Sequence, residues 1–201
     1  MSENTSTLDH STPHVQEAIV TEPSTNPVHQ SEMSSMRKLA VFSLTAFVYF
    51  LTWSCVGLWS PFFPGEATKR GVSSTEVGFI FGTYSLVAFL ASLIYGPVLI
   101  PQIGPYSVLF AGLFVNGGAN VISGFLNLIT ERKLFTIYCF IVRAVGALGG
   151  AACETAIIVI VTEEFRENLA TVIGILEVFT GLGLVVGPVL GGVLYSVRIN
   201  G

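Results

Sequence analysis

Charged residues are scarce in this sequence. Only 11% of its 201 residues are Asp, Glu, Lys or Arg, against about 25% in a typical soluble domain. About half, 51%, are apolar, and the mean hydropathy is +0.71. This composition excludes a water-soluble enzyme core, and we expect no enzymatic activity. The net charge of −4, without a basic stripe, also excludes a nucleic-acid-binding protein.

Cysteine and histidine are equally few, with three of each. Cys55, Cys139 and Cys153 fall in apolar runs, without the spacing of a metal site or a redox motif. We expect them to be small buried side chains. All three histidines precede Arg37, so none lies in the apolar region. The sequence therefore predicts neither a metal site nor a cofactor.

The chain divides into a polar tail and an apolar region. Residues 1–38 are rich in Ser, Thr, Pro and acidic residues and have no hydrophobic period, which predicts a disordered tail. A helix needs about 20 apolar residues to cross a bilayer. Five such runs follow, at 39–60, 76–98, 106–128, 134–161 and 170–197, before a short C-terminal tail, 198–201. We expect an all-α, polytopic transmembrane bundle, in which short connections make consecutive helices antiparallel neighbours.

Three ionisable side chains fall inside the predicted spans: Arg143 and Glu154 in the fourth, and Glu177 in the fifth. A charge at this depth costs about 2.5–3.5 kcal/mol or more unless it has a partner or a wet cavity. Arg143 and Glu154 are 11 residues apart, so they project from one helix face about 16 Å apart. Gly146 and Gly150 lie on the same face and leave room for another backbone or a ligand.

Two interpretations of these charges stay open. Glu154 and Glu177 each lie about eight residues from the 162–169 loop, or roughly 10–12 Å deep, which puts both carboxylates within reach of one cavity. Burial favours the protonated form of a carboxyl group and a nearby guanidinium favours the ionised form. The pair therefore suits a site that holds either protons or an organic cation. In the alternative, Arg143 pairs with one of the glutamates and only fixes helix packing.

The fifth run contains the most specific motif. It reads Gly183-Leu-Val-Val-Gly187-Pro188-Val-Leu-Gly191-Gly192. Its four glycines open a smooth groove, and Pro188 removes a backbone hydrogen bond and bends the helix. We interpret the segment as a pivot for moving one group of helices against another. The alternative is ordinary packing of small residues.

Three aromatic residues are candidates for contact with an ammonium group. Tyr49 and Trp53 share a face of the first run, and Tyr84 lies in the second. Aromatic rings bind such cations through their faces. Packing, or a position at the membrane interface, is the alternative interpretation.

The GxxxGPxxGG motif at the end of a fifth span, with an arginine in the fourth, resembles the antiporter motif of the major facilitator superfamily. The segments 60–64, 110–118 and 168–183 resemble the vesicular amine transporter branch of that superfamily, most closely its polyamine-transporting members. The resemblance covers residues 39 to about 197. By this resemblance Arg143 matches the fourth-helix arginine, and Glu177 falls in a stretch typical of the branch.

The resemblance implies a twelve-helix membrane transporter that exchanges lumenal protons for cytoplasmic polyamines or monoamines. It also implies a secretory or synaptic vesicle membrane and a cytoplasmic N-terminus. Lys and Arg near the span ends number three on the tail side and four on the other, so the positive-inside rule alone does not assign the orientation. The expected partners are small organic cations, protons and the lipid bilayer.

The sequence departs from the family pattern in two ways. The loop after the second span, 96–104, lacks the charged residues usual there, and five spans replace the two six-helix halves. We therefore expect a truncated N-terminal portion of a transporter, inactive alone. The alternative is a non-transporting five-span isoform that regulates or pairs with the full-length transporter. A membrane scaffold or channel is disfavoured, because it has no need for such costly buried charges.

Overall fold

The computed structural model describes the backbone of residues 27–200, and the side-chain exposure of 35–58, 60–126 and 129–193. Helices and no strands form within residues 27–200, and five helical segments there are long and apolar enough to cross a membrane. The predicted all-α bundle with five spans is confirmed. The segments are Ser35–Lys69, Ser74–Ile103, Pro105–Gly124, Arg132–Glu164 and Leu169–Val193.

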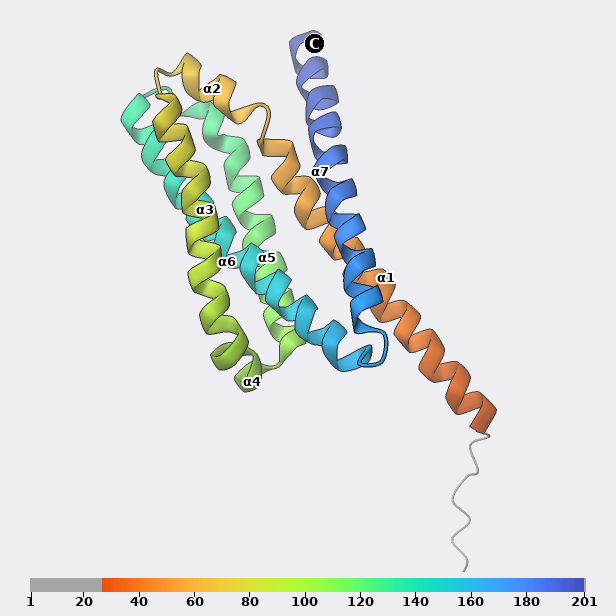
Figure 1. Ribbon diagram of the computed structural model, residues 1–201. Coiled ribbons are helices and arrows are strands. Elements are labelled where there is room, and N and C mark those ends of the chain that lie inside the picture. Colours follow the sequence, from red (N-terminus) through yellow and green to blue (C-terminus); the bar gives the residue numbers. More distant parts are fainter. Residues whose placement is uncertain (1–26, 201) are drawn as a thin grey trace, which may run out of the picture.

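Individual helices follow one another with few breaks (Figure 1). In chain order they are α1 (Pro27–Trp59), α2 (Phe63–Lys69), α3 (Ser74–Ile94), the π-helical η1 (Tyr95–Leu99), α4 (Ile100–Ile103), α5 (Pro105–Gly124), the 3₁₀ turn η2 (Phe125–Leu128), α6 (Arg132–Glu164) and α7 (Leu169–Asn200).

The first and last helices are longer than the predicted spans. Helix α1 begins at Pro27, inside the predicted tail of residues 1–38. Proline suits the first helical position, and the Gln, Glu, Met, Arg and Lys residues that follow it favour helix. The rest of the predicted tail, 1–26, lies outside the described residues. Helix α7 continues to Asn200, through most of the predicted C-terminal tail, and Gly201 lies outside the described residues.

The second span also continues past its predicted end. Pro97 lies in η1, where the helix widens to a π turn and then returns to α-helix in α4. A π turn is a common way to accommodate a break in the regular hydrogen-bond ladder. Gly104 ends the segment with a φ of 82°, in a region that glycine enters without strain.

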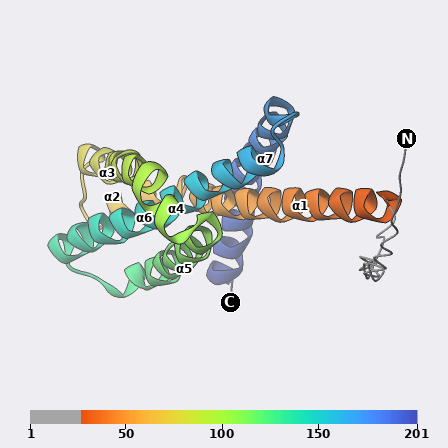
Figure 2. The same cartoon turned by 90° about the horizontal axis from the view of Figure 1, so that it is seen from below.

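Helix α6 is the centre of the bundle. In the most apolar 18-residue stretch of this span 61% of the residues are buried, against 17–33% in the corresponding stretches of the other spans. It packs along α3 and α5, whereas α1 packs along α7 and touches α6 at few points (Figures 1 and 2). The prediction that consecutive spans pack as neighbours is confirmed for α5 and α6. It is wrong for α1, whose principal neighbour α7 is distant in sequence.

Glycine explains why α1 and α7 pair. A Cβ atom on Gly183 would lie 2.7 Å from the carbonyl oxygen of Phe50, and one on Gly187 would lie 2.8 Å from the amide nitrogen of Leu58. Both residues therefore let the two backbones touch. Because the contact residues advance along both helices together, α1 and α7 run parallel.

One end of the bundle is closed by α2. Phe63 of α2 is buried, and its ring lies 5.7 Å from that of Phe81 and 6.3 Å from that of Phe135. Arg70 places its guanidinium carbon 4.7 Å from the centre of the Phe135 ring and donates a hydrogen bond to the Glu66 carboxylate at 2.9 Å. These contacts hold α2 across the ends of α3 and α6.

Many large apolar side chains point outward. Phe79, Phe110 and Phe114 are 66%, 69% and 85% exposed. Such a continuous apolar exterior is unfavourable in water and favourable in the hydrocarbon of a bilayer. The chain is therefore a multi-pass membrane protein.

Candidate functional site

Arg143 is buried in the middle of the bundle, 8% exposed, on α6. Its guanidinium carbon lies 4.8 Å from the centre of the Phe81 ring and 5.6 Å from that of Tyr84, both on α3. The electron-rich faces of aromatic rings attract a cation, more strongly where water is excluded. The aromatic contacts therefore offset part of the cost of holding this charge within the bilayer.

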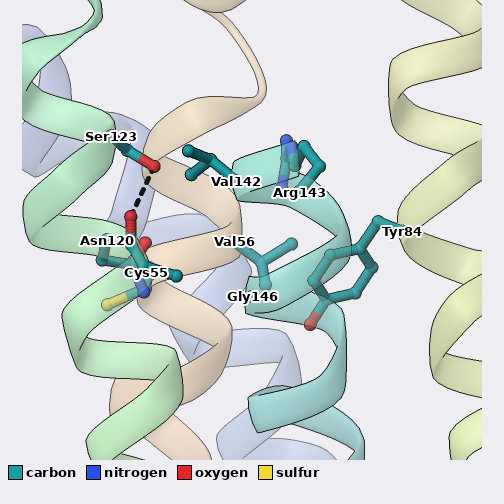
Figure 3. A pocket seen from close by; sticks show the side chains of 9 residues that line it. Cys55, Val56, Tyr84, Asn120, Ser123, Val142, Arg143 and Gly146 are labelled. Carbon is teal, nitrogen blue, oxygen red and sulfur yellow. Dashed lines mark hydrogen bonds between the residues drawn. The ribbon is translucent and has the colours of Figure 1, made fainter. Parts of the chain in front are cut away.

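A small cavity adjoins Arg143, and side chains of α1, α3, α5 and α6 surround it (Figure 3). Its lining consists of Cys55, Val56, Tyr84, Ala119, Asn120, Ser123, Val142, Arg143 and Gly146. Ser123 donates a hydrogen bond to the carbonyl oxygen of Ala119 at 2.8 Å. Asn120 donates one to the carbonyl oxygen of Asn116 at 2.9 Å. The cavity is thus polar on one side and cationic on the other.

A second group of polar side chains joins α1, α6 and α7. Glu154 is half-buried on α6, Glu177 is exposed on α7, and Tyr49 is 7% exposed on α1. Tyr49 packs in one buried cluster with Cys153 and Leu176, which precede Glu154 and Glu177 in the sequence, so the two carboxylates flank that cluster. Three separate helices therefore bring together two acidic groups and one phenol.

Tyr84 lies near both groups. Its ring faces Arg143, and the charges of Arg143 and Glu154 both act on its hydroxyl group. The hydroxyl oxygen would lie 2.5 Å from a Cβ atom on Gly150. The space predicted on this face of α6 is thus occupied by the Tyr84 side chain, which would have to shift if position 150 carried a Cβ atom.

Trp53 lies at the contact between α1 and α7. Its Cβ atom would be 3.0 Å from a Cβ on Gly183, and its indole packs against the buried core around Tyr49. Within the described residues, the indole N–H of Trp53 and the hydroxyl group of Thr180 are buried without a hydrogen-bond partner. Trp53 therefore adds an apolar face and a buried donor to the junction of α1 and α7.

The glycine-proline motif of α7 faces α1. Gly183 and Gly187 contact the α1 backbone, and a Cβ on Gly191 would lie 2.6 Å from the Phe62 ring. Pro188 lies against Gly57 of α1, whereas Gly192 has only a distant contact with Phe62. Close packing of small residues is thus one role of the motif. Its role as a pivot stays a prediction.

Phe81, Asn120 and Ser123 complete the surroundings of Arg143 and were not among the predicted site residues. Phe81 precedes Tyr84 by three residues, a spacing that places both rings on one helix face. Asn120 and Ser123 repeat this spacing on α5. A polar or aromatic pair three residues apart within an apolar span was the available signal. Within the described part of the chain, no group of three or more His, Cys, Asp or Glu side chains is placed to hold a metal ion.

Five apolar helices, two of them with ionisable side chains inside the span, define a polytopic membrane protein. The family model of the Major Facilitator Superfamily matches residues 42–199. The chain belongs to this superfamily of transporters.

Similar proteins carry a transporter name. The chain is 48% identical over 146 residues to "MFS-type transporter SLC18B1" of Rattus norvegicus and equally to that of Mus musculus. It is 44% identical over 142 residues to the protein of that name in Homo sapiens. These matches cover 71–73% of this chain and 31% of each relative, so the chain spans about a third of their length. No solved structure matches it.

Proposed function

We propose that these five spans form part of a proton-coupled antiporter for polyamines or monoamines. The membership of a transporter family supports the general activity. The observation that carries the finer proposal is the group of Glu154, Glu177 and Tyr49 at the junction of three helices. Polyamines and monoamines are cations at neutral pH, and a pair of carboxylates is a suitable counter-charge for them.

The chemistry of exchange follows from the closeness of the two carboxylates. Two ionised acids that repel each other favour the uptake of a positive charge, and a proton or an ammonium group supplies it equally well. Protonation of Glu154 or Glu177 neutralises the carboxylate that attracts the ammonium group, and the organic cation is then released. Binding of the cation on one side of the membrane and of protons on the other then gives antiport.

The neighbouring rings contribute to recognition of the cation in this proposal. Tyr49 and Trp53 on α1 and Tyr84 on α3 present aromatic surface to the same region. Cation–π contacts of this kind contribute about 0.5–2 kcal/mol each. Arg143 holds a fixed positive charge over the Tyr84 ring. This charge repels a second cation from that part of the bundle.

The membrane in which the protein lies and the set of helices needed for transport are also proposals. We infer a secretory or synaptic vesicle membrane and a cytoplasmic N-terminus from the resemblance to vesicular amine transporters. Alternating access needs two transporter halves that move against each other, and we infer that the five described spans all belong to one half. We therefore expect no transport by the 201-residue chain alone.

A chimaera tests this function. The chain replaces the segment that it matches in the rat relative, and the purified protein is reconstituted in liposomes with an acidic interior. We expect accumulation of labelled spermidine or of a labelled monoamine, abolished by a protonophore. Liposomes with the 201-residue chain alone provide the matched comparison. Accumulation that is absent, or equal with and without the gradient, would contradict proton-coupled antiport.

A further inference from the structure

The cavity beside Arg143 has a lining with a distinctive charge. Arg143 brings one positive charge, which arginine keeps at any accessible pH. None of the nine lining residues is acidic. In Figure 3 Asn120, Ser123 and Cys55 lie on one side of the cavity, and Arg143 and Tyr84 lie on the other. A small molecule in this space therefore meets a cation and several polar groups, and no carboxylate.

The size of the cavity limits the occupant. The centre of a water-sized molecule is free to occupy about 20 Å³ there, and about 10–15 Å³ is enough for one such molecule. One water or one monatomic ion fits. A polyatomic organic ion does not.

Electrostatics decides between these occupants. Arg143 is 8% exposed, and its Nε and Nη2 atoms are shielded from solvent. Much of the cost of desolvating the guanidinium is therefore already met by the fold. The attraction between opposite charges is stronger in this shielded interior than in water, whereas a neutral occupant gains only a hydrogen bond.

We propose that this cavity between α1, α3, α5 and α6 is a binding site for one small monovalent anion, with chloride as the most abundant example. Arg143 supplies the charge and the Cys55 thiol a weak donor, whereas the donors of Asn120 and Ser123 already bond within α5. The bound anion neutralises the only charged residue of the lining and thereby stabilises the packing of α6 against α3 and α5. This site does not depend on the transported substrate and is separate from the Glu154 and Glu177 pair.

The test is the thermal stability of the 201-residue chain in lipid nanodiscs. Sodium chloride is compared with sodium gluconate at equal ionic strength, so that general screening is the same in both. We expect the unfolding midpoint to rise by about 2–4 °C in chloride and to saturate, as for binding at one site. Equal midpoints in the two salts would show that the cavity holds water only and would overturn the proposal.

Three variants locate the effect. Asn120→Asp places a carboxylate in the cavity, so its midpoint should no longer respond to chloride and should rise in gluconate. Arg143→Gln removes the positive charge and should also lose the response. Arg70→Gln is the matched control, because Arg70 lies over the Phe135 ring outside this cavity, and it should keep the full response.

Direct binding of radioactive chloride gives an independent measurement. We expect about one bound chloride per wild-type chain and none in Asn120→Asp. This binding measurement decides the question even where Arg143→Gln fails to fold. A full chloride response or undiminished binding in Asn120→Asp would place the anion elsewhere and overturn the proposal.

Discussion

At the scale of single residues, this bundle depends on glycines whose missing side chain is replaced by a group from another helix. Gly150 makes room for the hydroxyl group of Tyr84, and Gly149 makes room for the backbone of α5, where a Cβ would lie 2.5 Å from the amide nitrogen of Asn116. A flexible side chain can move away from such a contact, but a backbone amide in a helix cannot. The two positions should therefore respond differently to the same substitution.

We predict that Gly149→Ala lowers the free energy of unfolding by about 1–3 kcal/mol, the usual cost of overpacking. Gly117→Ala is the control, because Gly117 of α5 has no atom within 4 Å of a Cβ and alanine favours helix by up to about 1 kcal/mol. Thermal unfolding in nanodiscs measures both. A stability of Gly149→Ala equal to that of Gly117→Ala would show that α5 and α6 do not approach this closely.

A second prediction concerns the rings that hold Arg143. Phe81→Leu keeps an apolar side chain but removes the aromatic face, so it should cost about 0.5–2 kcal/mol. Phe81→Tyr keeps the face and should cost less. The two unfolding midpoints, measured side by side, check this. The same loss in both variants would show that packing, and not the cation–π contact, stabilises Arg143.

At the scale of helices, the principal finding is that α6 organises one group, with α3 and α5, while α1 and α7 form another. The two groups meet where Glu154, Glu177 and Tyr49 gather. Ion pairs at the two ends support the arrangement: Arg37 with Glu164 at 2.8 Å and Arg132 with Glu76 at 2.9 Å. Water and salt screen such exposed pairs, so they contribute little and packing dominates.

Helix α2 offers a prediction at this scale. Phe63→Ala removes the ring that joins α2 to Phe81 and Phe135, and it should destabilise the fold by about 3–5 kcal/mol. Phe114→Ala, at an 85% exposed position, should change stability by about 0.5 kcal/mol or less. Chemical or thermal unfolding of the pair checks the difference. Equal effects would mean that α2 does not close the bundle.

Span length and hydropathy are local properties, which is why the sequence alone predicted five spans. The pairing of α1 with α7 depends on contacts between Gly183 or Gly187 and a backbone about 130 residues away, and no local pattern contains them. The candidate charges and aromatic residues stood out because they are costly or rare in an apolar span. Phe81 did not stand out, since its role arises only when α3 packs on α6.

At the scale of the whole molecule, the chain is a set of five membrane spans that belongs to the Major Facilitator Superfamily and covers 31% of the length of its named relatives. Its apolar exterior requires lipid or further protein as a neighbour. It carries two polar regions, one cationic around the buried Arg143 and one acidic around the half-buried Glu154 and the exposed Glu177, with Tyr84 in reach of both.

In the proposed mechanism, the carboxylates of Glu154 and Glu177 carry the exchange of protons for organic cations. The most direct measurement is gradient-driven spermidine uptake by the chimaera with Glu154→Gln or Glu177→Gln. We predict a fall of about tenfold or more in each, because loss of a charged contact costs about 1.5–3 kcal/mol. Glu163→Gln, at an exposed acid near the end of α6, should keep the parent level. Parent-level, gradient-dependent uptake in both the Glu154→Gln and the Glu177→Gln variant would contradict this mechanism.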